Sequence, residues 1–169
     1  KPSAIGLVSV STTLATNAVV EGHGSPVAVF LIGFDSAMAS RTGIAKAFPH
    51  VPLRMIAGGH DHNGDASAPL DVASVEREAA LLRGEVSAFA VASAFAVRNP
   101  EHENLARDII MRVTGKPVTL STELTSSLDA PRRALTAVLN ARLISRISLL
   151  IDAVRLAMAH LDISCPLMV

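Results

Sequence analysis

Two continuous apolar runs constrain the fold of this 169-residue chain more than any other feature. Residues 26–32 read P-V-A-V-F-L-I, and the most apolar run extends from Val86 to Val97. A strand with one solvated face alternates apolar and polar residues, whereas a strand covered on both faces is apolar throughout. Both runs therefore predict buried strands in a sheet that has helices on both faces.

Strand and helix patterns alternate along the chain. Val75, Ala79 and Leu82, for example, lie at helical spacing. Because consecutive parallel strands need helical crossovers, the alternation predicts an α/β fold with a largely parallel sheet. Predicted strands span 5–10, 26–32, 53–57, 86–95 and 117–121; predicted helices span 13–21, 36–47 with an interruption at 42–43, 70–82 and 101–113; residues 58–69 are a predicted loop.

The last predicted element, from Pro131 to about Leu161, is longer than the earlier ones. It fits one long helix or two helices broken near residues 145–148. Its apolar positions form a broad face, and such a leucine-rich surface favours association with a partner or a second copy of the chain. These positions are Leu135, Val138, Leu139, Leu143, Ile147, Leu150, Ile151 and Val154.

Charge and composition exclude several classes of protein. Fifteen basic and fifteen acidic residues balance, and the chain has five Phe but no Trp or Tyr. Without a basic patch or stacking rings we expect no nucleic-acid partner, and we expect no membrane partner because the longest apolar run is too short to span a bilayer. The single cysteine, Cys165, excludes an internal disulfide. We expect a cytoplasmic protein with one domain over residues 1–169.

A cluster of hydroxyl groups lies between an apolar run and an Ala/Val-rich segment. The order V-S-V-S-T-T-L-A-T-N-A-V-V-E-G, residues 8–22, predicts a strand, a turn and a helix. The first turn of a helix presents unpaired N–H groups and the positive end of the dipole, which hold phosphates or carboxylates. Thr12 and Thr13, with Asn17 one turn later, are candidate ligand-binding residues; an ordinary helix cap is the alternative.

A second concentration of polar groups is the loop G-G-H-D-H-N-G-D, residues 58–65. His60 and His62 with Asp61 and Asp65 supply imidazoles and carboxylates, which could bind a metal ion or contact a substrate. Asp, Asn and Gly are also the residues that turns select, so a plain loop is the third interpretation. We assign no metal ligand from this pattern.

Three polar residues mark the beginning of the long helix. Arg133, Thr136 and Asn140 are spaced by three and four, which places them on one helix face. They could line a cleft between domains, or bond locally to the loop at residues 122–127. We interpret His102, at the start of an earlier helix, as a capping or packing residue.

Four stretches in the same order give the chain a resemblance to a known family. T-T-L-A-T-N-A-V-V-E-G-H-G, residues 12–24, is similar to the T-T-x-A-T-N-A-x-x-E-x-x-G segment of the hydantoinase/oxoprolinase family, whose members open cyclic amides at the expense of ATP. The later stretches are P-L-D at 69–71, N-P-E-H-E at 99–103 and R-A-L-T-A-V-L-N-A at 133–141. Together they touch nearly the whole chain.

The resemblance implies part of an actin-like (ribonuclease H-like) ATPase fold excised from a longer chain, with the sites for ATP and Mg²⁺ largely outside it. It implies that phosphorylation of the ring amide oxygen lets water open a hydantoin or 5-oxoproline, and it names no general base. The remaining domains or a second subunit would be partners, a homo-oligomer is open, and the isolated chain would be inactive. The implied nucleotide- or substrate-binding residues are Thr12, Thr13, Asn17, His60, Asp61, Arg133, Thr136 and Asn140.

Two departures from the family pattern leave other functions open. The family usually has His-Gly before T-T, where this chain has Val10-Ser11, and it often has a His near Thr122, where this chain has none. A side chain in place of Gly puts direct phosphate contact at Ser11 in doubt. The alternatives are a subunit of an ATP-dependent ketone carboxylase, or a non-catalytic α/β module that binds a small ligand or a partner.

Overall fold

The computed structural model describes residues 5–10 and 24–168, apart from the side chains of residues 145, 146 and 149. Its contacts divide the chain into two compact units. Unit 1 contains residues 1–24 and 143–169, and unit 2 contains residues 25–142. The single domain expected from the chain length stays a prediction.

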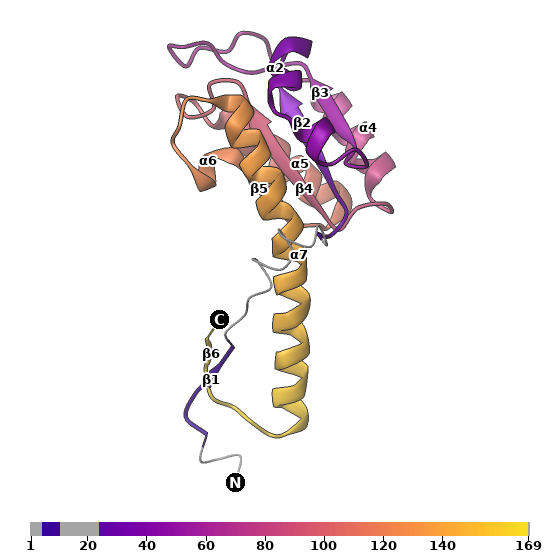
Figure 1. The fold of residues 1–169 in the computed structure, drawn as a ribbon, viewed down its shortest axis with the longest axis vertical. Helices are drawn as coiled ribbons and strands as arrows, with labels where there is room; N and C mark the ends of the chain where they lie inside the picture. Colours follow the sequence, from indigo (N-terminus) through magenta and orange to yellow (C-terminus); the bar gives the residue numbers. More distant parts are fainter. Residues whose placement is uncertain (1–4, 11–23, 169) are drawn as a thin grey trace. The chain divides into compact units, whose positions relative to one another are not determined.

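The core of unit 2 is a four-stranded parallel sheet in the order β3-β2-β4-β5 (Figure 1). The two central strands, β2 (Val27–Ile32) and β4 (Ala88–Ser93), are the two apolar runs, and every residue in them is buried. The outer strands are β3 (Leu53–Ile56) and β5 (Val118–Leu120). The parallel sheet and its buried central strands are therefore confirmed.

Helices cover both faces of this sheet. On one face Phe30 and Phe89 meet edge to face, with ring centroids 5.7 Å apart, and pack with α4 (Val72–Leu82) and α5 (Glu101–Thr114). On the other face Leu31 and Ala90 pack with α3 (Ile44–Ala47) and the first half of α7 (Ala130–His160). Neighbouring residues of a strand point to opposite faces, so each all-apolar strand supplies both cores.

The helices of unit 2 begin and end close to the predicted positions. Asp35 caps α2 (Ser36–Arg41) by accepting a bond from the amide of Met38 at 2.7 Å, and Gly43, at φ +68°, separates α2 from α3. Pro100 directly precedes α5, and Asn99 precedes Pro100. The side chain of Asn99 accepts a hydrogen bond from the amide of Glu101 at 3.0 Å. Ser121 begins a short helix, α6 (Ser121–Leu124), instead of ending β5.

The segment from Ala130 to His160 is one helix, α7, which decides between the two alternatives for the end of the chain. Within unit 2 its buried line consists of small side chains. Leu135 and Leu139, which we expected on the apolar face, are half-buried beside that line. The buried line is Ala130, Ala134, Ala137, Val138 and Ala141.

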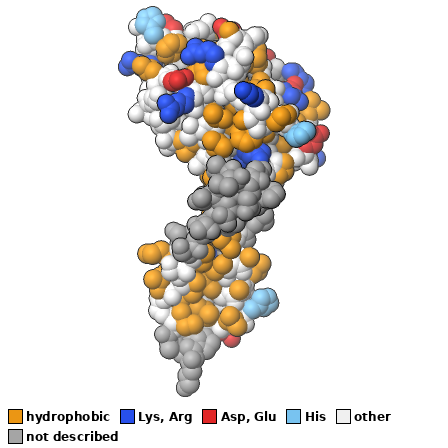
Figure 2. Space-filling model, viewed as in Figure 1, with side chains coloured by type: hydrophobic (Ala, Val, Ile, Leu, Met, Phe, Trp, Pro, Cys, Tyr) orange, Lys and Arg blue, Asp and Glu red, His pale blue; other side chains and the backbone are white. Residues whose placement is uncertain are grey.

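Unit 1 joins the two ends of the described chain. β1 (Val8–Ser9) pairs in parallel with β6 (Leu167–Met168), and the second half of α7 belongs to the same unit. Figure 2 shows hydrophobic side chains over the visible surface of this part of α7. Leu156 on α7 is 64% exposed, and Leu161, directly after its end, is 60% exposed. No helix among the described residues is long and apolar enough to cross a membrane. The predicted helix at 13–21, with Thr13 and Asn17, and the neighbouring Thr12 lie outside the described residues.

Candidate functional site

In the strand order of unit 2, the connections that follow the neighbouring strands β2 and β4 run to opposite faces of the sheet. The chain leaves β2 through α2 and α3, which lie on one face of the sheet, and leaves β4 through α5, which lies on the other. Loops that leave neighbouring parallel strands toward opposite faces open a crevice at the carboxyl ends of those strands, where α/β proteins bind ligands. A ligand site is therefore expected at the point between the ends of β2 and β4.

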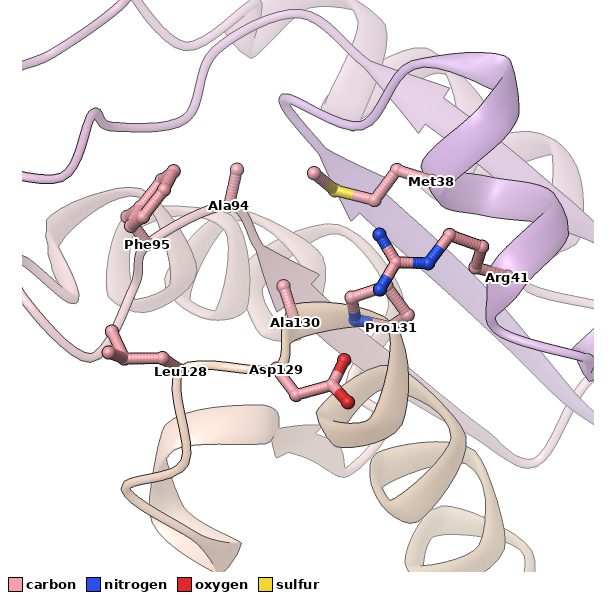
Figure 3. Close-up of a pocket in the computed structure, with 8 residues that line it drawn as sticks. All are labelled: Met38, Arg41, Ala94, Phe95, Leu128, Asp129, Ala130 and Pro131. Carbon is pink, nitrogen blue, oxygen red and sulfur yellow. The ribbon is translucent and has the colours of Figure 1, made fainter.

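A cavity of about 330 Å³ lies at this point. Figure 3 shows Met38 and Arg41 reaching into it from α2, opposite Ala94 and Phe95, which follow β4. Phe95 has a φ of +52°, an uncommon conformation for a residue with a side chain. The other residues that line the cavity come from the start of α7 and the loop before it: Leu128, Asp129, Ala130 and Pro131.

The lining is apolar except for two charged side chains at its border. Arg41 forms no ion pair with any residue that the structure describes. Asp129 caps α7 by accepting from the amide of Arg132 at 3.3 Å, and its carboxylate keeps further acceptor capacity. The cavity thus offers one group that only donates hydrogen bonds and one that only accepts them.

The end of β4 is held from both faces by charged side chains. β5 ends at Leu120, opposite Val91, so the N–H and C=O of Ser93 have no neighbouring strand on that side. Glu103 of α5 accepts from the amide of Ser93 at 2.8 Å, and Arg133 of α7 donates to the carbonyl of Ser93 at 2.8 Å. The two side chains take the place of the missing strand.

Glu103 and Arg133 belong to one buried network, and both are fully buried. Glu103 also accepts from the hydroxyl of Ser121 at 2.6 Å and from the amide and hydroxyl of Thr122 at 3.1 and 2.8 Å. Arg133 donates to the same Ser121 hydroxyl at 3.2 Å and to the carbonyl of Ser127 at 2.7 Å. Burial lowers the pKa of Arg133, while the charges of Glu103 and Asp129 act in the opposite direction. The network fixes the loop that leads into the cavity.

Two histidines stack where the loop after β3 meets α5. The rings of His60 and His102 have centroids 4.2 Å apart, and the amide of Gly59 donates to Nδ1 of His102 at 2.9 Å. His60 is 2% exposed, and neither of its ring nitrogens has a hydrogen-bond partner among the described residues. Burial and the neighbouring His60 lower the pKa of His102. His102 therefore favours the neutral ring, and because its Nδ1 accepts from Gly59, its proton is on Nε2.

The rest of the histidine loop has ordinary turn chemistry. Asp61 accepts at 2.8–3.0 Å from the amides of Asn63, Gly64 and Asp65, and these bonds lower its pKa against the effect of desolvation. His62 is exposed. Among the described residues no group of three or more His, Cys, Asp or Glu side chains is placed to hold a metal ion.

The structure separates the three polar residues of α7. Arg133 is buried and bonds to Ser127 within the loop 122–127, which agrees with the local alternative. Thr136 is exposed and donates to the carbonyl of Arg132 in its own helix. Asn140 is half-buried, and its Oδ1 has no partner among the described residues. A role for the three in a cleft stays a prediction.

Sequence reasoning missed the residues that line the cavity and, apart from Arg133, those that hold the end of β4. Glu103 in the first turn of a helix matches a favourable dipole position, and nothing in its spacing reveals that it is buried. Arg41 and Asp129 lie 88 positions apart and meet only through the sheet order. His102 and His60 lie 42 positions apart, and only the packing of the loop after β3 against α5 brings their rings together.

Two solved structures share the fold. An ATP-dependent caprolactamase from Pseudomonas jessenii is 24% identical, with a TM-score of 0.81 over 98% of this chain and 26% of that chain. A nucleotide-free structure of an acetone carboxylase is 19% identical, with a TM-score of 0.65 over 80% of this chain and 23% of that chain. This chain thus spans about a quarter of the length of either. The likeness confirms the α/β fold expected from the sequence.

A comparison with curated proteins found no match. The family described as the hydantoinase/oxoprolinase N-terminal region matches residues 1–114, about two thirds of the chain. This range includes three of the four family-like stretches, from the Thr12 segment to N-P-E-H-E at 99–103. The chain therefore belongs to the hydantoinase/oxoprolinase family.

Proposed function

We propose that the protein containing this chain is an ATP-dependent hydrolase that opens a cyclic amide, a hydantoin or 5-oxoproline. Membership of the hydantoinase/oxoprolinase family carries this proposal. The fold shared with an ATP-dependent caprolactamase supports it, because caprolactam is also a cyclic amide. A ring amide is a poor electrophile, so ATP supplies activation of its oxygen, and the protein then needs to position groups and stabilise charge.

We place the nucleotide outside the cavity of unit 2. The carboxylate of Asp129 at the border of that cavity would repel a polyphosphate, and Asp35 already caps the nearby helix α2. Thr12, Thr13 and Asn17 are the candidates of this chain for the phosphate end, with Mg²⁺ held mainly by phosphates and water. We derive no catalytic step through ATP from the described residues.

The other candidate residues receive narrower proposed roles. Arg133 positions the end of β4 and the loop at Ser127 from inside the fold. His60 and Asp61 shape the loop after β3, His60 through its contact with His102 and Asp61 through its amide bonds. Thr136 and Asn140 remain candidates for a contact with another domain or subunit.

ADP release by the full-length protein, together with any adjacent subunit, tests this function. We expect release to rise with 5-oxoproline or one of a panel of hydantoins and the opened acid to appear in equal amount. Thr13→Ala should reduce ring-dependent release, whereas Ser40→Ala, an exposed position on α2, should leave it unchanged. ADP release that is the same with and without every ring would reject the proposal.

An ATP-dependent ketone carboxylase is the second candidate, favoured by the fold shared with acetone carboxylase. In that case ADP release would need a ketone and bicarbonate together. A protein that responds to neither set would support the non-catalytic binding module.

A further inference from the structure

The geometry points to the cavity between the ends of β2 and β4 as the binding site for the ring of a neutral cyclic amide. This inference rests on the proposed function for its ligand class, and on the shape and charge of the cavity for its place. About 330 Å³ is at the lower end of the range of about 300–1,000 Å³ for small-molecule sites. The volume suits one small ring.

The walls fit the carbon atoms of such a ring. Met38, Phe95 and Leu128 present apolar side chains to the cavity (Figure 3). Met38 has an unbranched, adaptable side chain, so the cavity can close around rings of slightly different size. Phe95 is held beside the cavity because Ser93, two residues earlier, is bonded by both Glu103 and Arg133.

The two charged groups fit the amide of the ring. The guanidinium of Arg41 only donates hydrogen bonds, and the carboxylate of Asp129 only accepts them. An amide within a small ring is held in the cis form, which presents its C=O and N–H side by side. The carbonyl can therefore accept from Arg41 while the N–H donates to Asp129, and both bonds are charge-assisted.

The same pair disfavours other ligands. An inorganic phosphate or a nucleotide phosphate would be attracted to Arg41 but repelled by the carboxylate of Asp129. A purely apolar molecule would leave both groups without a partner. A ring-opened amino acid carries both a positive and a negative charge, at the two ends of a flexible chain. Ordering that chain on binding costs conformational entropy, so the opened product binds more weakly than the ring.

Methyl NMR of the full-length protein with ¹³C-methyl methionine tests the inference without ATP. We expect the Met38 signal to shift on addition of caprolactam or hydantoin, two rings that are uncharged near pH 7, while the signal of Met111, which is 49% exposed on α5, stays in place. Inorganic phosphate and 6-aminohexanoate are the comparison ligands. The inference is overturned if the Met38 signal does not shift with either ring, or if it shifts more with either comparison ligand than with the rings.

Variants separate the cavity from the rest of the protein. Arg41→Gln should weaken ring binding about tenfold to a hundredfold by removing a charge-assisted bond. Asp129→Asn should weaken it similarly while keeping the oxygen that caps α7. Leu128→Trp, at a position 53% exposed, should fill part of the cavity without entering the core. Arg83→Gln, an exposed arginine beyond the end of α4, is the matched control and should bind normally.

The two proposals fail in different ways. Ring binding at Met38 without ring-dependent ADP release would keep the cavity site and reject the hydrolase. Ring-dependent ADP release with normal ring binding in the Arg41→Gln and Asp129→Asn variants would keep the hydrolase and reject this site.

Discussion

At the scale of single residues, the most demanding positions of unit 2 are polar groups buried inside it. Glu103 receives four hydrogen bonds, from Ser93, Ser121 and both polar groups of Thr122, and is fully buried. A buried carboxylate is tolerated only when its oxygens are satisfied in this way. Glu103 therefore makes the end of β4 rigid and sensitive to small chemical changes.

Glu103→Gln should lower the free energy of unfolding by about 3 kcal/mol. The amide nitrogen of Gln would replace an acceptor by a donor and would face N–H and O–H donors. Urea unfolding measures the loss. Glu123→Gln is the matched control, because Glu123 is exposed in an ion pair with Arg107, and its effect should be about 0.5 kcal/mol or less. Equal effects of the two variants would show that the buried network contributes little.

The stacked histidines predict how stability depends on pH. The pKa of His102 is lowered in the folded state by burial and by His60, with Glu101 acting weakly in the opposite direction. The unfolded chain therefore binds the proton more readily than the folded chain. His102 adds stability above its ordinary pKa of about 6.5, and that contribution is lost as the pH falls through the lower folded pKa.

The midpoint of thermal unfolding should therefore drop between about pH 7 and pH 5, and His102→Gln should make this dependence shallower. Gln keeps an acceptor for the amide of Gly59 but does not titrate. His50→Gln, at an exposed histidine, should leave the slope unchanged. A slope that is the same in the wild type and in the His102 variant would contradict the prediction.

At the scale of elements, the carboxyl ends of β2 and β3 approach each other closely. Gly33, which follows β2, has a φ of +70°, and a Cβ added there would lie 2.6 Å from the carbonyl oxygen of Gly58. Gly43, between α2 and α3, has nearly the same φ of +68°, but its Cβ would meet nothing within 4 Å. Comparing substitutions at the two glycines therefore separates the cost of the left-handed conformation from the cost of steric crowding.

Gly43→Ala should destabilise unit 2 by about 1–2 kcal/mol, the effect of the left-handed conformation alone. Gly33→Ala should add about 1–3 kcal/mol because the backbone of the β3 loop must move. Chemical unfolding of both variants measures the difference. Equal destabilisation by the two substitutions would contradict the prediction, because it would show that the loop after β3 moves at no measurable cost in stability.

At the scale of the whole molecule, the sequence of unit 2 is inserted between the two chain segments that form unit 1. Residues 25–142 contain the complete sheet and both hydrophobic clusters, whereas unit 1 is made from the two ends of the chain. The parallel pairing of Val8 with Leu167 brings those ends together. Unit 2, a continuous segment with its own core, can therefore be tested by itself.

Residues 25–142 expressed alone should fold and unfold in one cooperative transition, because their core needs no residue from unit 1. Circular dichroism during urea unfolding measures this. Residues 25–120, which lack α7 and so lose Arg133 and Ala137 from the structure, should not fold stably and serve as the control. A 25–142 chain without a cooperative transition would contradict the prediction.

We also expect the 169-residue chain to release no ADP in response to a cyclic amide. It spans about a quarter of the solved chains whose fold it shares, and the family resemblance places most of the nucleotide site elsewhere. The full-length protein in the same assay is the positive control. Ring-dependent ADP release by this chain alone would contradict the expectation.

The sequence by itself determined the fold class and most element positions of unit 2. The strands β2 and β4 follow from uninterrupted apolar runs, and α5 follows from Pro100 at its start and Gly115 at its end. These features are local, because burial on both faces and helix termination leave their mark on neighbouring residues. The four family-like stretches, spread along the chain, identified its family.

Only the tertiary structure decided which side chains meet. The order β3-β2-β4-β5 brings Arg41 to Asp129 at one cavity, His60 to His102, and Glu103 to Ser121. Strand order depends on which crossover packs on which face, and that choice is a property of the whole core, not of any short stretch of sequence. For the same reason Arg133, expected beside Thr136 on a polar stripe, lies inside the fold at the end of β4.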